Sequence, residues 1–121
     1  MSEFHALMWN VKLGTEDQVR ELFKNYGRPD PTIRDDDGNE VGKLLGTQVF
    51  LKGNTVVRVV EVEGSLREVA VHMGKQPAVR DLEEKLDDLL ETPRDMSTPQ
   101  GAAAFFRQSA MEVLIARKAG E

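Results

Sequence analysis

Short runs of hydrophobic residues predict three β-strands. Residues 4–13 (FHALMWNVKL) are too few and too continuously apolar for a surface helix, and Gly14 follows them. Residues 44–52 and 55–63 are rich in β-branched side chains. Only Gly53-Asn54 separates these two runs, a dipeptide typical of a tight hairpin turn. The pattern therefore predicts an N-terminal strand and a central β-hairpin.

Elsewhere the apolar residues recur at helical spacing. Each of these segments follows a residue that commonly begins a helix. Four helices are predicted, with starts at Thr15, Ser65, Pro77 and Thr98-Pro99. The first ends near Gly27, because glycine commonly follows the last helical turn. Residues 111–117 (MEVLIAR) either continue the last helix or form a closing strand, and we favour the strand.

Residues 28–43 (RPDPTIRDDDGNEVGK) contain two prolines, two glycines and five acidic residues, so we expect a loop. A loop of this length in a small domain is commonly functional or mobile. The pair Asp37-Gly38 can close a turn that makes part of it a small hairpin. The acidic run does not fit a calcium loop, because the spacing around Gly38 puts Ile33 and Leu44 at ligand positions. A solvated turn explains it better.

The order of elements predicts a ferredoxin-like α+β fold, with an antiparallel sheet and helices on one face. The chain has 121 residues, which fits one domain spanning 1–121. The first strand is apolar on both faces, with Phe4 and Met8 on one and Leu7 and Trp9 on the other. An antiparallel sheet with one exposed face normally shows polar residues there. We therefore expect a homodimer that packs sheet against sheet.

Composition narrows the functional classes. Lys and Arg number 16 against 21 Asp and Glu, a net charge of −5, which argues against nucleic-acid binding. There is no cysteine, and only His5 and His72 supply imidazole, so we expect no metal site and no bound cofactor. No apolar run has the length of a membrane span and no signal peptide is visible. We expect a cytoplasmic protein that does not bind membranes.

Three polar side chains are candidates for chemistry. Arg58 interrupts an apolar strand, so it either forms a salt bridge at the sheet rim or stabilises an oxyanion in an apolar pocket. Glu61 lies on the opposite face of that strand and is not the obvious partner. His72 either interacts with the end of its helix or acts as an acid–base group at a cavity rim. Tyr26 points its hydroxyl either into the same space or into water.

Several long stretches carry a resemblance to a known family. HALMWNVKLGTEDQV, LFKNYGRPD, DDDGNEVGKLLGTQVF, KGNTVVRVVEVEG, QPAVRDLE and PRDMSTPQGAAAFF together resemble the SchA/CurD-like family, over residues 5–117. Its members are small proteins encoded with bacterial type II polyketide synthases, notably those for spore pigment. The layout is also similar to the dimeric α+β barrel group, which includes tetracenomycin-type aromatic polyketide cyclases and cofactor-independent monooxygenases.

The resemblance implies a barrel formed across a dimer and an apolar pocket between each sheet and its helices. Polar pocket positions of the cyclases would fall near Tyr26, Thr47 and Arg58, although the cyclases carry more histidine there. We expect a polyketide cyclase in which Arg58 stabilises an oxyanion, His72 acts as acid–base group and Tyr26 orients the substrate. Such an enzyme mainly folds a reactive poly-β-keto chain and excludes water.

The remaining substrate contacts are expected around this pocket. Trp9 would stack on the substrate rings, and His5 shares its strand face. The loop 28–43 would be a lid, with Arg28 and Arg34 touching substrate oxygens. Arg94 and Asp95 lie between two prolines, where we expect a local ion pair.

Two other functions stay open. A cofactor-independent monooxygenase that converts an aromatic ring to a quinone would use the same kind of pocket. A non-catalytic partner of the synthase would hold the acyl chain and contact an acyl carrier protein or ketosynthase. The acidic net charge makes a grip on an acidic carrier protein less natural.

Overall fold

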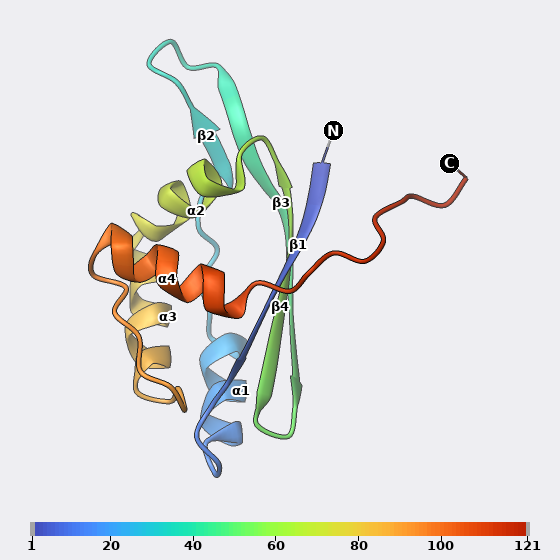
Figure 1. Ribbon diagram of the computed structural model, residues 1–121. Helices are drawn as coiled ribbons and strands as arrows, with labels where there is room; N and C mark the ends of the chain where they lie inside the picture. Colours follow the sequence, from blue (N-terminus) through green and yellow to red (C-terminus); the bar gives the residue numbers. More distant parts are fainter. Residues whose placement is uncertain (1, 121) are drawn as a thin grey trace.

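A computed structural model describes residues 2–120 as a four-stranded antiparallel sheet with helices against one face (Figure 1). The strands are β1 (Ser2–Asn10), β2 (Thr32–Arg34), β3 (Glu40–Lys52) and β4 (Thr55–Glu63), in the order β1-β4-β3-β2. The helices are α1 (Glu16–Lys24), α2 (Leu66–Gly74), α3 (Pro77–Asp87) and α4 (Pro99–Ser109). The predicted α+β class is confirmed.

Local sequence signals account for most of the element boundaries. Gly53 begins the turn between β3 and β4 with a φ of 58°, a conformation that glycine adopts without steric cost. The Ser65 hydroxyl accepts a hydrogen bond from the Glu68 amide and caps α2. Thr98 caps α4 in the same way. Thr15 precedes α1 as expected, but its hydroxyl donates to the Lys12 carbonyl and does not cap the helix.

The segment 28–43 is more regular than the predicted loop. Residues 32–34 form β2 and pair with the start of β3, so much of the segment is a β-hairpin. At its tip the Asp35 carboxylate accepts hydrogen bonds from the amides of Asp37 and Asn39, both at 2.9 Å. These bonds, with Asn39 contributing most, lower the pKa of Asp35. The acidic run is thus a hydrogen-bonded turn, and only residues 28–31 remain an irregular connection.

The prediction of a strand at residues 111–117 is wrong. One antiparallel bridge joins Ala110 to Leu7, and the Met111 amide donates to the Ala6 carbonyl at 2.9 Å. The chain then leaves the edge of β1 and runs away from the domain (Figure 1). A strand needs a continuous ladder of partners, and this pairing stops after one bridge.

The hydrophobic core lies between the sheet and the helices. Its most deeply buried side chains are Val11, Val56, Val62, Leu82 and Leu86. No described helix covers the opposite face, and Phe50 on that face is 54% exposed. The homodimer expected from these two apolar faces stays a prediction. Within residues 2–120, none of the helices combines the length and apolar content needed to span a bilayer.

Candidate functional site

Arg58 lies in the middle of the helix-covered face of the sheet. Its position on β4 is opposite Leu7 of β1 and Val49 of β3. The guanidinium carbon lies 5.6 Å from the ring centre of Trp9 and 5.7 Å from that of Phe23. Only 17% of the Arg58 side chain is exposed. A cation in such surroundings needs a counter-charge.

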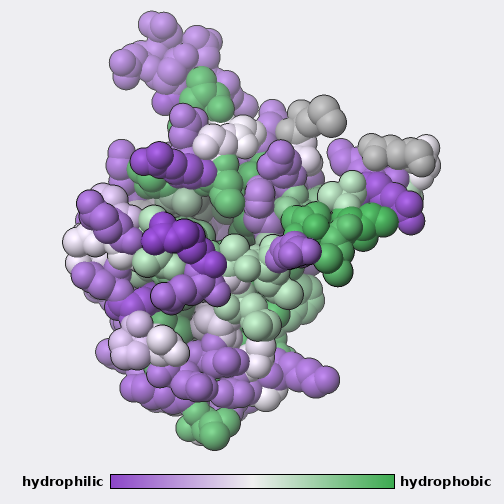
Figure 2. Space-filling model, viewed as in Figure 1, coloured by the Kyte–Doolittle hydropathy of each residue, from purple (hydrophilic) through white to green (hydrophobic). Residues whose placement is uncertain are grey.

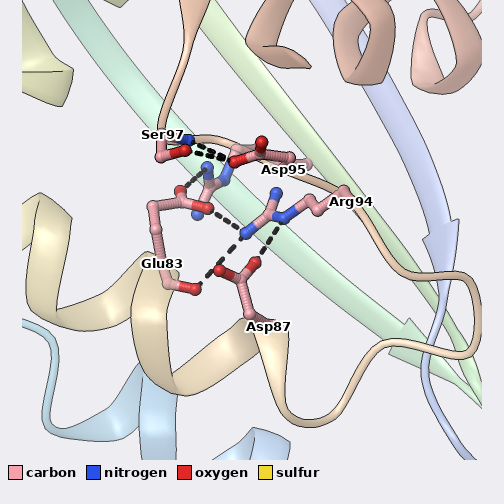
Figure 3. A network of polar contacts seen from close by, with 6 residues as sticks. Glu83, Asp87, Arg94, Asp95 and Ser97 are labelled. Carbon is pink, nitrogen blue, oxygen red and sulfur yellow. Dashed lines mark hydrogen bonds and ion pairs between the residues drawn. The ribbon is translucent and has the colours of Figure 1, made fainter.

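Glu83 of α3 supplies that counter-charge. Its Oε1 lies 3.4 Å from Nη1 of Arg58, and its Oε2 accepts a hydrogen bond from Nη2 of Arg94 at 2.5 Å. Arg94 is itself only 5% exposed and donates from Nε to Asp87 at 2.7 Å. Figure 3 shows the Arg94 guanidinium pointing between the carboxylates of Glu83 and Asp87. The salt bridge of Arg58 thus exists, but towards a helix and not at the sheet rim.

The prediction of a local ion pair between Arg94 and Asp95 is wrong. Asp95 instead accepts hydrogen bonds from the amide and hydroxyl of Ser97 (Figure 3). These bonds lower the pKa of Asp95. Arg94 turns the other way because α3 offers two carboxylates and Phe105 offers a ring face 4.3 Å from the guanidinium carbon. Arg94 still pins its segment, but to α3.

A small hollow opens between the sheet and the connection 28–31, and none of the ion-paired residues Arg58, Glu83, Asp87 and Arg94 lines it. Its volume is about 370 Å³, within the range of small-molecule pockets. Apolar side chains dominate its wall, together with two polar ones. The lining residues are Tyr26, Gly27, Arg28, Pro29, Pro31, Leu44, Thr47 and Met73. Three predicted site residues, Tyr26, Arg28 and Thr47, therefore meet there.

Tyr26 links the hollow to the ion-pair cluster. Burial raises the pKa of its phenol, the positive charge of Arg58 partly offsets this, and the negative charge of Glu83 adds to it. The phenol is therefore protonated at neutral pH. Tyr26 can donate a hydrogen bond to a ligand oxygen, but it is not a phenolate base.

His72 holds the connection that borders the hollow. Its Nε2 lies 2.9 Å from the Asp30 carbonyl oxygen, which can only accept, so Nε2 carries a proton and donates. The amide group of Gln76 binds the backbone of the same residue twice, donating to the Asp30 carbonyl at 2.7 Å and accepting from the Asp30 amide at 2.6 Å. The described contacts of His72 are thus with the 28–31 backbone.

The other predicted contacts are more scattered. Trp9 is a core residue whose ring packs at 6.0 Å from that of Phe105. His5 lies further along β1, with Nε2 3.3 Å from a Glu3 carboxylate oxygen. Arg34 lies in the hairpin, where it binds the Gly38 carbonyl and lies 3.6 Å from Glu40. None of these three residues lines the hollow.

Three buried nitrogen atoms on the inner sheet face have no hydrogen-bond partner among the residues that the structure describes. They are Nε1 of Trp9, Nε of Arg58 and Nε2 of His5, whose 3.3 Å approach to the Glu3 carboxylate is an ion-pair distance without hydrogen-bond geometry. Each unpaired buried donor costs about 1–3 kcal/mol, which a ligand oxygen can recover. Donors of this kind suit oxygen acceptors and not cations. In residues 2–120, no three His, Asp or Glu side chains gather as metal ligands.

Sequence reasoning missed Glu83, the residue that holds Arg58. One signal was available, because Glu83 lies four residues after Val79 and three before Leu86. That spacing puts it beside the buried stripe of its helix. Gln76 was also missed, and its position just before Pro77 gave no indication that it would reach Asp30.

The fold and site together define a small α+β domain. Helices cover one face of its sheet, Arg58 lies on that face, and a largely apolar hollow opens between the sheet and residues 28–31. The family model described as "SchA/CurD like domain" matches residues 2–118, and the chain belongs to this family.

Several curated Streptomyces proteins are similar over 107 residues, or 88% of this chain. They are the 42.8 kDa protein in the whiE locus of Streptomyces coelicolor at 42% identity, Polyketide synthase CurD of Streptomyces cyaneus at 41%, and Protein SchA of Streptomyces halstedii at 36%. The matches cover 26%, 28% and 27% of these proteins. The chain therefore corresponds to about a quarter of each relative's length, and the expectation that the family's members are small proteins is wrong for these relatives.

A solved structure shares the fold. Tetracenomycin F2 cyclase from Streptomyces glaucescens, a type II polyketide cyclase, matches with a TM-score of 0.56 over 97% of this chain and 98% of its own. Sequence identity is 14%, so this likeness shows the fold alone.

Proposed function

We propose that this chain acts as an aromatic polyketide cyclase-type tailoring domain beside a type II polyketide synthase, on a pathway to spore pigment or a related aromatic product. The observation that carries the proposal is the buried Arg58 guanidinium, fixed by Glu83 and left with an unpaired Nε donor. Membership of the SchA/CurD family and the name of the relative, Polyketide synthase CurD, support a role in polyketide biosynthesis. The shared fold with a polyketide cyclase supports the reaction class only by analogy.

Arg58 is suited to stabilising negative charge that develops on a carbonyl oxygen. Its surroundings are apolar and aromatic, where an oriented cation acts more strongly than in water. Glu83 fixes the guanidinium through Nη1, and the buried Nε has no hydrogen-bond partner among the described residues. Tyr26, protonated at neutral pH, donates to a second substrate oxygen and orients the chain.

The proposed step is an intramolecular aldol condensation. A methylene between two carbonyls loses a proton to water, and the enolate oxygen is stabilised by Arg58. The enolate carbon then bonds to a ketone carbon of the same chain, and the ketone oxygen takes up a proton. Elimination of one water gives the ring double bond, so the substrate is neither oxidised nor reduced. Correct folding of the chain supplies up to roughly 7–11 kcal/mol of the barrier lowering.

The hollow and its bordering connection select the substrate. Leu44 and Met73 offer apolar surface to a flat ring, and Thr47 and Arg28 offer polar contacts at the wall. We assign His72 to positioning, because its Nε2 already holds the Asp30 carbonyl. The proposed lid is the connection 28–31, and the hairpin beyond it carries Arg34 out of reach of the hollow.

The test is accurate mass of the products made by the cognate minimal polyketide synthase with and without this protein, in air and without oxygen. The acyl chain arrives on the carrier protein, so synthase and carrier are both included. We expect products that differ in ring pattern or by loss of water, equally in air and without oxygen. Arg67→Ala, a change at an exposed arginine of α2, serves as the control variant.

Other outcomes contradict the proposal in distinct ways. Products that gain oxygen only in air would identify a quinone-forming monooxygenase. Unchanged products, together with binding to the carrier protein or ketosynthase, would identify a non-catalytic partner.

A further inference from the structure

The carboxylate of Glu83 is divided between two arginines. Its Oε1 lies 3.4 Å from Nη1 of Arg58, and its Oε2 accepts a hydrogen bond from Nη2 of Arg94 at 2.5 Å. Charge-assisted bonds from nitrogen to a carboxylate oxygen are commonly about 2.7–2.9 Å long. Glu83 is therefore bound closely to Arg94, and its contact with Arg58 is the long one of the two.

Arg94 is held by partners other than this carboxylate. Its Nε donates to Oδ1 of Asp87 at 2.7 Å, and its guanidinium carbon lies 4.3 Å from the ring centre of Phe105. Figure 2 shows hydrophilic side chains over much of the surface around α3 and α4, yet the Arg94 side chain is turned inward and only 5% exposed. Because Arg94 is fixed independently, it sets the position of the Glu83 carboxylate (Figure 3).

Arg58 is paired through one nitrogen. Among the residues that the structure describes, Glu83 is its one ion-pair partner, and the buried Nε has no hydrogen-bond partner. A carboxylate that faces a single arginine frequently accepts two parallel N–H···O bonds from it. Glu83 does not, because its Oε2 is engaged by Arg94. The incomplete pairing of Arg58 thus follows from the shared carboxylate.

We propose that Arg94 is a positioning residue for Arg58: by holding Oε2 of Glu83, it prevents a two-bond pair between Glu83 and Arg58 and keeps the Nε donor of Arg58 unpaired. Sharing the carboxylate also leaves more of the positive charge of Arg58 unneutralised in its aromatic surroundings. Both effects favour the stabilisation of an oxyanion. The use of this donor on a substrate rests on the proposed function, whereas the pairing of the side chains does not.

The first test is NMR of the arginine side chains in protein labelled with heavy nitrogen. The Nε–H proton of Arg58 is identified by its absence from the spectrum of Arg58→Lys. In Arg94→Met, which keeps an apolar stem against Phe105, Glu83 is free to pair twice with Arg58, and this proton should shift downfield. Arg107→Met, at an exposed arginine of α4, should leave it unchanged.

A rescue variant separates positioning from a general structural role. Adding Glu83→Gln to Arg94→Met leaves one neutral acceptor oxygen, so the proton of Arg58 should return upfield, whereas damage to the fold would not be reversed. If Arg94→Met does not fold, Arg94→Met/Asp87→Asn removes a cation and a carboxylate together and should give the same downfield shift. Near-ultraviolet circular dichroism of Trp9, the single tryptophan, confirms folding.

Three results would overturn the proposal. The first is a resonance of Arg58 that does not move when Arg94 is lost, and the second is a shift that Glu83→Gln does not reverse. The third needs no variant: a scalar coupling across a hydrogen bond, between Nε of Arg58 and the carboxyl carbon of Glu83 in the wild type.

The second test is the product pattern of the minimal polyketide synthase. We expect Arg94→Met to lower the yield of the directed product at least tenfold, and Arg94→Met/Glu83→Gln to recover part of it. A downfield shift with unchanged products would support the positioning role of Arg94 and contradict the proposed function of Arg58. An unmoved resonance would overturn the positioning role whatever the products are.

Discussion

Arg58 of β4 and Glu83 of α3 lie 25 residues apart in the chain and 3.4 Å apart in space, from Nη1 to Oε1. Both side chains are less than one-fifth exposed. The contact ties the third helix to the centre of the sheet and fixes the one cation on the inner face of β4. Because Glu83 also binds Arg94, a single carboxylate balances two guanidinium groups at once.

Glu83→Gln should destabilise the fold. The amide keeps the size of the side chain but removes the charge between Arg58 and Arg94, and breaking a buried ion pair costs about 3–5 kcal/mol. Partial exposure of Glu83 reduces this to about 2–4 kcal/mol in the free energy of unfolding. Urea unfolding followed by Trp9 fluorescence measures the change. Glu84→Gln, at the exposed neighbouring position, is the control, and equal stability of the two variants would refute the role of Glu83.

Tyr26 should titrate above the pKa of a free tyrosine. It is the single tyrosine of the chain, so ultraviolet absorbance of the phenolate follows it directly. Arg58→Met should raise the pKa of Tyr26 further, because the cation that lowers it is lost. Arg67→Met should not change the value. A wild-type pKa at or below that of free tyrosine would contradict the burial of this phenol.

The raised pKa of Tyr26 makes the stability of the fold depend on pH. The folded chain retains the phenol proton at pH values where the unfolded chain has released it. The stabilisation is therefore complete below the ordinary tyrosine pKa of about 10 and declines as pH rises through the folded value. Tyr26→Phe should remove the part of this loss of stability that comes from the phenol. Unfolding curves at several alkaline pH values measure the difference from wild type.

His72→Ala should loosen the connection 28–31. One hydrogen bond to the Asp30 carbonyl is lost, worth about 0.5–1.5 kcal/mol, so amide exchange at Asp30 should accelerate several-fold. Gln76→Ala should have a larger effect because it removes two bonds. Lys75→Ala is the exposed control. A His72→Ala variant that loses turnover while hydrogen exchange at the Asp30 amide stays slow would indicate an acid–base group. That result would contradict the positioning role of His72.

Gly101→Ala should be strongly destabilising. A Cβ at this position in α4 would lie 1.8 Å from the Asp95 carbonyl oxygen, which is backbone and cannot swing aside. We expect a loss of at least about 2 kcal/mol in thermal or urea unfolding. Gly74→Ala at the end of α2 meets nothing within 4 Å and should be neutral or slightly stabilising. Equal behaviour of the two variants would contradict the close approach of α4 to the Asp95 turn.

The regular elements were predictable because their signals are local. The alternation around Gly53-Asn54 specifies a hairpin, and the caps at Ser65 and Thr98 specify helix starts. Residues 111–117 were expected to form a strand because their short apolar run is typical of one, whereas a strand also needs a partner. No neighbour in the described chain offers one beyond Leu7.

The candidate site was predictable in part. Arg58 was identified because a charge inside an apolar run is unusual, and Tyr26 and Thr47 do meet at one hollow. The partner of Arg58 was not identified, since its contact depends on how α3 crosses the sheet. The same reason applies to His72, whose hydrogen bond to Asp30 joins positions 42 residues apart. Side-chain partners across packed layers are set by tertiary geometry, which single-sequence patterns do not contain.

The most direct test of the central claim is the product pattern of the minimal polyketide synthase supplemented with Arg58→Ala or with Arg67→Ala. Both proteins must first show the wild-type near-ultraviolet spectrum of Trp9. The account predicts that Arg67→Ala directs the same ring pattern as wild type, whereas Arg58→Ala yields the pattern obtained without the protein. A folded Arg58→Ala variant that directs the wild-type ring pattern would contradict it.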